Sequence, residues 1–258
     1  RLGLQGPNAT NTTACAASTH AIGYATRLIQ MGYADVVVSG GTESVMSPVG
    51  MAGFQNMTAL SSSGQSKPFD KDRDGFMMTE GSATLVLEEM SSAQSRGANI
   101  YGEVLGSGST ADAHHITAPA PGGDGALRCM QLAIEDSGLA STDIASVNAH
   151  GTSTPLNDAA EAEALSKLFG EDGPPVTSTK GVTGHALGAA GAIEATAVLL
   201  SFLHKQIPPT AGFVNRDPEM AGFNIVTGSG LEWEPGPSMS NSFGFGGHNG
   251  SIVLAPVN

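Results

Sequence analysis

Hydrophobic and polar positions along the first third of the chain predict strands that alternate with helices. Residues 17–32 have the apolar spacing of a helix and end at a glycine, and the β-branched run ADVVVSGG at 34–41 is typical of a buried strand. Residues 82–90 predict a second strand, which leads into a helix that ends near residue 97. The glycine-, serine- and methionine-rich stretch 50–81 predicts irregular structure.

The same alternation starts again after residue 98. Strands are predicted at 99–109, 144–151, 175–180, 223–229, 238–247 and 250–257, the last two as a hairpin, and helices at 122–139, 155–170 and 186–205. Strands that alternate with helices predict a layered α/β architecture, with helices packed against a central sheet. No linker forces a domain boundary, and no strong internal repeat is present.

Composition narrows the class of protein. A chain of 258 residues that is 40% hydrophobic and 14% charged can bury a sizeable core. Its net charge of −13 argues against a nucleic-acid partner, because no basic patch meets phosphates. No apolar run reaches the ~18 residues that a membrane span needs. Two cysteines far apart exclude a disulfide scaffold and suit a reducing compartment.

Cys15 precedes the first predicted helix, within the small-residue stretch NTTACAASTHAIG at 11–23. A nucleophile held at a helix N-terminus would have its thiolate favoured by backbone N–H groups and by the helix dipole. A small buried cysteine without any chemical role would fit the same stretch. Cys15 alone leaves both interpretations open.

Three other polar stretches lie at the predicted ends of strands, where reactive groups of α/β sheets collect. VNAHGTSTPLND carries His150, STKGVTGHALGAAG carries Lys180 and His185, and the glycine-dense turn NSFGFGGHNG carries Phe243 and Phe245. Each has an ordinary structural explanation by itself, but together with the cysteine they favour a reactive site. A metal site fits less well, because neither histidine has a local partner at ligand spacing.

These stretches resemble the signature segments of β-ketoacyl-[acyl-carrier-protein] synthases, most closely the type II elongating enzymes of fatty acid synthesis. The segments are TACAAS, NAHGTSTPLND, STKGVTGHALGAAGAIE, NSFGFGGHNGS, PFDKDRDGF and DAHHITAP, which together run along essentially the whole chain. The resemblance implies a thiolase-like fold with the layers α/β/α/β/α. Residues 1–98 would be the remainder of the N-terminal half and residues 99–258 the C-terminal half. Because the chain begins just before the nucleophile, we expect it to be incomplete at the N-terminus.

The resemblance implies an acyltransferase that performs a decarboxylative Claisen condensation. An acyl group held on Cys15 is joined to malonyl-[acyl-carrier-protein], and His150 and His185 donate hydrogen bonds to the enolate oxygen. The backbone amides of Cys15 and Phe243 would stabilise the later oxyanion, with the Phe243 ring as a gate. Lys180 would support the site rather than act as an acid or base. Substrate and pantetheine contacts are implied for Thr117, Thr152, Thr154 and Phe245.

Acidic residues are expected behind this site. Glu194 lies in a nearly apolar predicted helix, where a buried carboxylate needs a cationic partner, and Lys180 is the candidate. Asp158 and Glu161 lie three residues apart on one predicted helix face and are candidates for the same network.

The resemblance also implies partners. We expect acyl carrier protein and a second copy of the chain, no metal, and no cofactor other than the phosphopantetheine that arrives on the carrier. A cytoplasmic location is expected, or a plastid or mitochondrion in a eukaryote. Thr58 and Ser63 stand where relatives often carry carrier-docking arginines, and GFMMTEGSA at 75–83 departs from the family's glycine-rich segment. The basic residues left as docking candidates are Lys67, Lys71, Arg73 and Arg128.

Three rival interpretations stay open. A thiolase would bring a second cysteine in the C-terminal glycine-rich turn, and that turn has none here. A ketosynthase domain of a polyketide synthase shares the same motifs. A catalytically incomplete fragment or partner subunit is a further alternative, although noncatalytic relatives usually lose the cysteine that this chain retains as Cys15.

Overall fold

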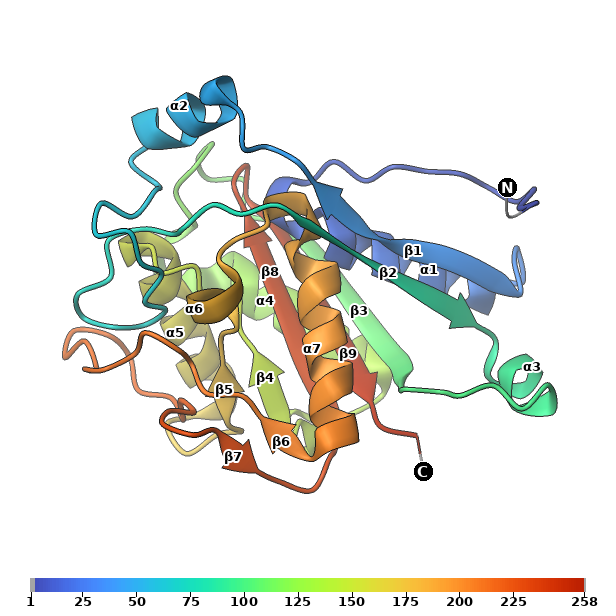
Figure 1. Ribbon diagram of the computed structural model, residues 1–258. Coiled ribbons are helices and arrows are strands. Elements are labelled where there is room, and N and C mark those ends of the chain that lie inside the picture. Colours follow the sequence, from blue (N-terminus) through green and yellow to red (C-terminus); the bar gives the residue numbers. More distant parts are fainter. Residues whose placement is uncertain (1–2, 258) are drawn as a thin grey trace.

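The computed structural model describes residues 3–257, which form helices and strands in a mixed α/β arrangement (Figure 1). The first part of the chain contains η1 (Ala14–Ala16), α1 (Ala17–Gln30), β1 (Val36–Glu43), α2 (Pro48–Asn56), β2 (Gly81–Glu88), α3 (Met90–Ser95) and β3 (Glu103–Ala111). The middle contains η2 (Pro121–Gly123), α4 (Asp124–Ser137), η3 (Ser141–Asp143), β4 (Ser146–Asn148), α5 (Pro155–Phe169), β5 (Val176–Thr177) and α6 (Lys180–Thr183). The last part contains η4 (Leu187–Ala189), α7 (Ala190–His204), β6 (Gln206–Ile207), β7 (Leu231–Glu232), β8 (Ser238–Gly244) and β9 (His248–Ala255).

A five-stranded mixed sheet forms the centre of the molecule, in the order β3-β9-β8-β4-β5. The hairpin β8–β9 and the pair β3–β9 are antiparallel, whereas β4 runs parallel to both β8 and β5. Strands β4, β8 and β9 are buried along nearly their whole length, because helices cover both faces of the sheet. The parallel strands bring the loop after β4 and the loop after β5 to one edge of this sheet.

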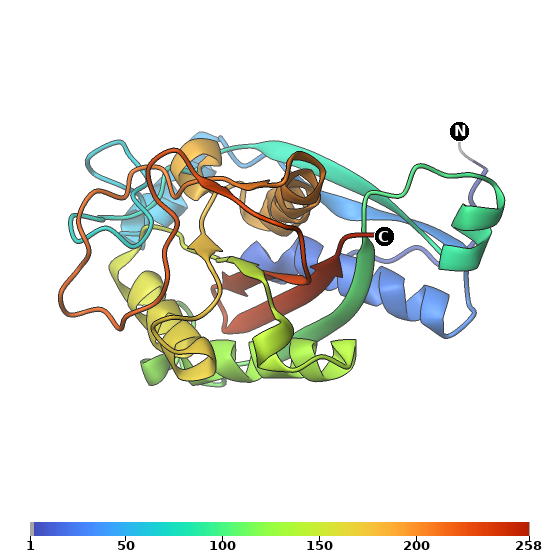
Figure 2. The same cartoon turned by 90° about the horizontal axis from the view of Figure 1, so that it is seen from below.

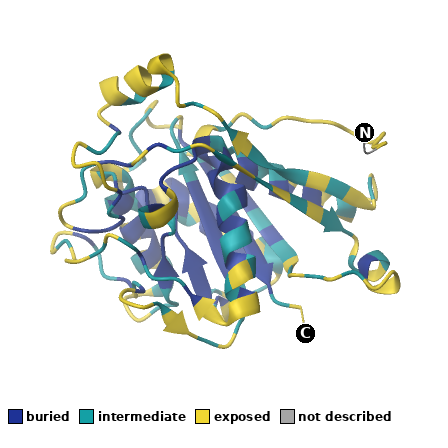
Figure 3. Cartoon of the chain, viewed as in Figure 1, coloured by how far each residue is buried: buried dark blue, intermediate teal, exposed yellow. Residues whose placement is uncertain are grey.

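The elements stack in layers (Figure 2). Helix α4 packs on β3 and β9 and contacts α5, while α1 and α7 lie on the other face of the sheet. Helices α1 and α7 also contact the antiparallel pair β1–β2, which forms a fourth layer. The predicted fifth layer, a helical cover over β1–β2, is absent from residues 3–257, and Val36, Val38 and Val86 are accordingly exposed (Figure 3).

Apolar side chains fill the space between these layers. Met130 of α4, Leu165 of α5 and Met239 of β8 belong to the core on one face of the five-stranded sheet. Ile22 of α1 and Phe202 of α7 belong to the core on the opposite face. A third, smaller cluster surrounds Cys15 and is described with the site below.

Two predicted segments differ from the structure. The stretch 50–81 is not wholly irregular, because α2 begins at 48, where the Ser47 hydroxyl accepts a hydrogen bond from the Gly50 amide at 3.1 Å. The strand predicted at 223–229 is reduced to one bridge between Val176 and Ile225. Prolines at 174 and 175 carry no N–H that could extend the pairing on one side, and on the other side the Val226 carbonyl accepts a hydrogen bond from the Thr210 amide at 2.8 Å.

Helix α7 also corrects the sequence-based view of membrane segments. The window Leu187–His204 has the length and mean hydropathy, 1.5, of a membrane span, and no other stretch in the described part of the chain has both. However, 56% of this window is buried inside the protein, and α7 packs between β2 and β8. The window is therefore the apolar core helix of the layered fold.

Candidate active site

Three segments far apart in the sequence meet around Cys15. The Cys15 sulfur lies 3.0 Å from His185 Nε2, and the ring centroids of His185 and His150 are 5.3 Å apart. Cys15, His150 and His185 are exposed by only 4%, 1% and 1%. We call these three residues the reacting cluster.

The cysteine lies in η1, directly before α1. Ala14, the preceding residue, has φ = 49°, a left-handed conformation that costs a non-glycine residue free energy. The glycines of the HALGAAG segment let η4 and α7 approach this turn. A Cβ atom on Gly191 would lie 2.0 Å from Thr19 Oγ1, so only glycine fits there. This close approach brings His185, five residues before α7, to the thiol.

Glu161 holds the loop that carries His150. The loop follows β4, and the two carboxylate oxygens of Glu161 accept hydrogen bonds from the amides of His150 at 2.8 Å and Gly151 at 2.7 Å. Burial raises the pKa of the Glu161 carboxyl to about 7. The predicted position of Glu161 behind the site is therefore observed, and its partners are backbone amides.

Asp158 fastens the next part of the same loop to the long segment between α2 and β2. Its carboxylate accepts hydrogen bonds from the amides of Phe69 at 2.7 Å and Ser153 at 3.1 Å. Burial raises the pKa of this carboxyl as well, because the charged form loses its hydration. Asp158 thereby ties PFDKDRDGF to NAHGTSTPLND, which the sequence alone did not connect.

The predicted ion pair between Lys180 and Glu194 is present and almost fully buried. The Lys180 ammonium donates to the Glu194 carboxylate and also to the carbonyl oxygen of His150, at 2.6 Å. Lys180 therefore supports the backbone of one reacting residue and does not touch the thiol. Together with Asp158 and Glu161, this pair forms what we call the supporting network.

The electrostatics of the reacting cluster differ from the sequence-based expectation of a favoured thiolate. Burial raises the pKa of the Cys15 thiol to about 11, although the Lys180 charge opposes the shift. Burial, followed by the Lys180 charge, lowers the pKa of both His150 and His185 well below the usual range. The resting cluster is consequently a neutral thiol beside two neutral imidazoles, because desolvation outweighs the helix-terminus effect.

The two phenylalanines of the glycine-rich turn have different surroundings. Burial raises the pKa of the Cys15 thiol and the backbone of Phe245 opposes this shift, whereas the backbone of Phe243 opposes the lowering of the His150 pKa by burial. The Phe245 ring packs in the cluster around Cys15 and stacks on Phe54, with ring centroids 6.3 Å apart. The expected role of the Phe243 amide at the oxyanion stays a prediction.

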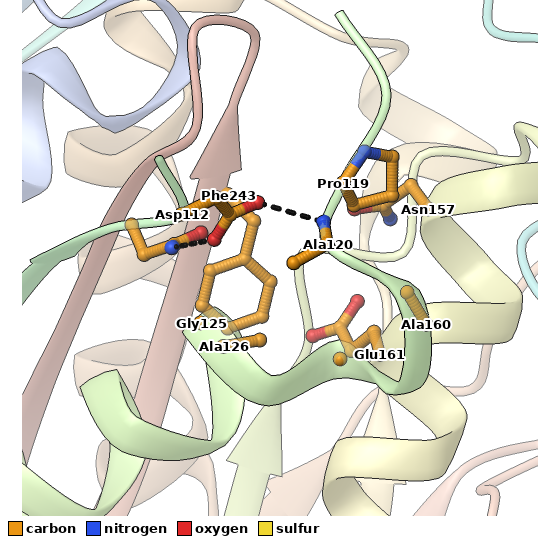
Figure 4. Close-up of a pocket in the computed structure, with 11 residues that line it drawn as sticks. Asp112, Pro119, Ala120, Gly125, Ala126, Asn157, Ala160, Glu161 and Phe243 are labelled. Carbon is orange, nitrogen blue, oxygen red and sulfur yellow. Dashed lines mark hydrogen bonds between the residues drawn. The ribbon is translucent and has the colours of Figure 1, made fainter. Parts of the chain in front are cut away.

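Phe243 lines a small cavity together with residues of the DAHHITAP segment and of α4 and α5 (Figure 4). Glu161 is among the residues that line this cavity. The carboxylate of Asp112 accepts hydrogen bonds there from the Ala120 amide at 3.0 Å and from Asn249 Nδ2 at 2.6 Å. Asp112 and Asn249 thus fasten DAHHITAP to the hairpin, a role that sequence reasoning missed although both lie in quoted motifs.

Of the threonines predicted to contact pantetheine, Thr152 and Thr154 lie in the loop after His150, whereas Thr117 lies in a different segment. Thr152 is buried beside His150, and its hydroxyl lies 2.9 Å from that of Thr154. Thr117 contacts its neighbour His115, whose Nδ1 accepts from the Thr117 amide at 3.1 Å. Its segment reaches the site region through the Gly246 amide, which donates to the carbonyl of Ile116 at 2.8 Å. The roles of these threonines stay predictions.

One aromatic neighbour of the reacting cluster was not singled out from the sequence. The ring of Phe76 packs edge-on against His185, with centroids 4.9 Å apart, and is 2% exposed. Phe76 ends the quoted motif PFDKDRDGF, so its position in that motif was the available signal. It limits the movement of the His185 ring and excludes water from one side.

Not all the docking candidates are free to bind a partner. Arg73 is committed to an ion pair with Asp217 at 2.7 Å, and its side chain is 7% exposed. This removes it from the predicted docking set. Lys71 and Arg128 are exposed, and Arg128 is held by a hydrogen bond to the Ala111 carbonyl at 3.1 Å.

The fold changes the argument against a metal ion. That argument used local spacing, but the thiol and one ring nitrogen of each histidine in the reacting cluster lie within 4.8 Å of one another. No other such group of three His, Cys, Asp or Glu residues occurs among residues 3–257. Sequence spacing therefore does not exclude metal binding at this site.

Comparisons with known proteins agree with this geometry. The chain matches the family description "Beta-ketoacyl synthase, N-terminal domain" over residues 1–93 and "Beta-ketoacyl synthase, C-terminal domain" over residues 101–214. The chain therefore belongs to the β-ketoacyl synthase family. The predicted division at residue 98 stays a prediction.

Curated relatives and solved structures extend the comparison. The chain is 48% identical to 3-oxoacyl-[acyl-carrier-protein] synthase 2 of Synechocystis sp., over 98% of this chain and 62% of the relative. It is 46% identical to the Staphylococcus aureus protein of the same name, over 98% of this chain and 64% of the relative. The chain thus spans less than two thirds of the length of these relatives.

Two solved structures are similar over nearly all of this chain. A β-ketoacyl synthase from Burkholderia phymatum STM815 superposes with a TM-score of 0.92, at 39% identity, over 96% of this chain and 61% of that one. The ketosynthase from module 6 of the bacillaene synthase of Bacillus subtilis 168 gives 0.94 at 29% identity, over 100% and 48%. The predicted thiolase-like fold is confirmed.

Proposed function

We propose that the protein is a β-ketoacyl-[acyl-carrier-protein] synthase that elongates fatty acids. The observation that carries this proposal is the reacting cluster, in which one buried thiol contacts one imidazole at 3.0 Å with a second imidazole beside it. A thiol suits transfer of an acyl group from a thioester, and two imidazoles suit stabilisation of an enolate.

Acyl transfer needs the thiolate of Cys15. Since the resting thiol is neutral, His185 Nε2, at 3.0 Å, is positioned to accept its proton as the sulfur attacks the acyl thioester. The carrier thiol leaves and takes up that proton, so the imidazole becomes neutral again. The backbone of Phe245 at the sulfur supports placement of the thioester oxygen in this turn.

Condensation needs two hydrogen-bond donors for the malonyl thioester. As CO₂ leaves, negative charge moves to the thioester oxygen, and neutral His150 and His185 each offer one N–H to it. The resulting carbanion attacks the acyl-Cys15 carbonyl and a carbon–carbon bond forms. The Cys15 sulfur leaves as a thiolate and takes up a proton from solvent. The lowered pKa of both imidazoles supports this role, because it keeps them neutral near pH 7.

A polyketide ketosynthase is the second candidate function. Structural neighbours include a type II ketosynthase solved with its acyl-carrier protein and bound to a hexaketide, with a TM-score of 0.93 at 33% identity. The higher identity of 46–48% to the curated 3-oxoacyl synthases favours fatty acids. Retention of Cys15 supports a catalytic chain over an inactive partner subunit.

The proposed partners are acyl carrier protein and a second copy of the chain. Lys71 and Arg128 are exposed cations that suit an acidic carrier, and the uncovered β1–β2 face suits further protein contact. No resident cofactor is required by the proposed chemistry, since the phosphopantetheine arrives on the carrier. The relatives named above support a soluble enzyme, which we place in the cytoplasm, or in a plastid or mitochondrion in a eukaryote.

Reconstitution tests this function. The full-length protein is incubated with a medium-chain acyl-carrier protein and malonyl-carrier protein, and the β-ketoacyl product and CO₂ are measured. We expect both in equal amounts with the wild type, and no β-ketoacyl product with Cys15→Ser. A product that has passed through several extensions without reduction would favour the polyketide alternative. Absence of Cys15 acylation in the full-length protein would contradict the proposal.

A further inference from the structure

The reacting cluster has the donor set of a zinc site. A sulfur from Cys15 and one ring nitrogen each from His150 and His185 converge within 4.8 Å, and all three residues are buried. Thiolate and imidazole are preferred ligands of Zn²⁺, and three protein ligands with an open fourth position are typical of accessible zinc sites. We propose that Zn²⁺ binds these three side chains and reversibly blocks the nucleophile.

The distances suit such binding after a small adjustment. Zinc bond lengths and a tetrahedral arrangement place ligand atoms roughly 3.3–3.6 Å apart. The Cys15–His185 contact of 3.0 Å is already this short. The widest pair, at up to 4.8 Å, must close by up to about 1.5 Å to reach the separation that tetrahedral zinc requires.

The wider separations involve His150, because Cys15 and His185 already lie 3.0 Å apart, and the His150 ring is able to make this adjustment. Nδ1 of His150 and Nδ1 of His185 are both buried without a hydrogen-bond partner among the described atoms. Ring rotation therefore breaks no protein hydrogen bond at these atoms. The same feature leaves the metal without the orienting contacts that fix histidine ligands in dedicated zinc sites. The expected binding is reversible and is lost to a chelator.

The binding step is a proton exchange without redox change. The S–H bond of Cys15 breaks, a Zn–S bond forms, and one proton leaves to solvent. A sulfur that is bonded to both an acyl group and Cβ carries no negative charge, so acylated Cys15 is a poor ligand. Metal and acyl group are therefore mutually exclusive on this sulfur.

Access to the site rests on the proposed function, because a thioester must reach the same sulfur. Cys129 is the natural comparison within the chain. It is equally buried, and its thiol contacts Thr110 and Ser251, with no histidine among its hydrogen-bond partners. If burial of a thiol were sufficient for metal binding, Cys129 would bind the metal as well as Cys15.

Cobalt spectroscopy tests the inference without any condensation assay. Co²⁺ is added to the full-length reduced protein, and the visible bands of four-coordinate cobalt and the thiolate charge-transfer band are recorded. We expect one Co²⁺ per chain, displacement by Zn²⁺, and no charge-transfer band in Cys15→Ser. His150→Gln removes one of the three ligands and should weaken binding by more than about 100-fold, because loss of a contact to a ligand alone already costs about tenfold to 100-fold, whereas Cys129→Ala should bind like the wild type.

A second measurement covers variants that fold poorly. In the wild-type protein, Zn²⁺ should slow alkylation of Cys15 by iodoacetamide at least tenfold, as mapped by mass spectrometry, and a chelator should restore it. Acylation of Cys15 beforehand should abolish cobalt binding. An unchanged cobalt spectrum in Cys15→Ser, or alkylation indifferent to Zn²⁺, would overturn the inference. Condensation without metal binding would refute only this inference, whereas metal binding without condensation would refute only the proposed function.

Discussion

The reacting cluster and the supporting network are equally buried but differ in how their polar atoms are bonded. In the supporting network, Glu161 and Asp158 each accept hydrogen bonds from two or more backbone amides, and Lys180 donates to a carboxylate and a carbonyl. One Glu194 oxygen is its unpartnered atom. In the reacting cluster, both imidazoles keep a buried Nδ1 without a partner.

This difference indicates that the reacting cluster serves the chemistry, whereas the supporting network stabilises the fold around it. An unpartnered buried polar atom costs free energy, and in the reacting cluster each histidine carries one such ring nitrogen. The hydrogen bonds of the supporting network instead hold the loop after β4, which carries His150 and Ser153. Changes in the reacting cluster should therefore affect turnover, and changes in the supporting network should affect folding and turnover together.

The largest expected effect is that of Cys15→Ser. Without the thiolate, condensation should fall by about 10⁴-fold or more, while the thermal midpoint changes little because the substitution is nearly isosteric. Mass spectrometry after exposure to an acyl thioester should find the acyl group on Cys15 in the wild type. Acylation mainly of Cys129 would refute the assignment of the nucleophile.

The two histidines should separate the two half-reactions. His150→Ala should slow malonyl decarboxylation by roughly 10²–10⁴-fold and leave acylation of Cys15 largely intact, because His150 supplies only an enolate contact. His185→Ala should impair both steps, since His185 touches the sulfur at 3.0 Å. CO₂ release and acylation are measured separately, and normal CO₂ release in both variants would contradict this division.

Lys180→Ala should destabilise the fold by about 3–5 kcal/mol and reduce activity, because it leaves Glu194 buried without a cation. Combining it with Glu194→Gln should recover part of the stability and little activity. A double-mutant cycle in chemical denaturation measures this coupling. Lys205→Ala is the matched control, since its pair with Glu234 is exposed and should contribute less than about 1 kcal/mol. Simple addition of the Lys180 and Glu194 effects would argue against the pair.

The smallest effect concerns pH. The Glu161 carboxyl titrates near 4.5 in the unfolded chain and near 7 in the folded protein, so between these values the folded protein keeps a proton that the unfolded chain has lost. Its contribution to stability is therefore lost as pH rises through this window, by roughly 3 kcal/mol at about 1.36 kcal/mol for each pH unit. The unfolding free energy of the wild type minus that of Glu161→Gln should fall accordingly.

Glu163→Gln provides the control for this titration. Glu163 lies two residues away on the same helix and is exposed, so its substitution should leave the pH profile unchanged. Denaturant titrations at several pH values between 4.5 and 7 compare the three proteins. Parallel profiles for the wild type and Glu161→Gln would show that the buried carboxyl does not titrate in this range.

The sequence determined the local elements and the residue types of the site. The apolar spacing at 17–32 predicted α1, the β-branched run at 34–41 predicted β1, and the same logic found α4, α5 and α7. It also predicted that Glu194, in an apolar helix, requires Lys180. Both features can be recognised from nearby residues in the sequence. The elements follow from the periodicity of apolar residues, and the need for a cation follows from the cost of a buried charge.

Only the tertiary structure decided how these groups meet. It brings His185 against a thiol 170 residues away in the sequence and pairs Arg73 with Asp217. It also raised the pKa of Cys15, where the helix start alone predicted the reverse. The physical reason is that desolvation and side-chain convergence depend on residues far apart in the chain. A local sequence pattern does not show which distant residues will surround a given group.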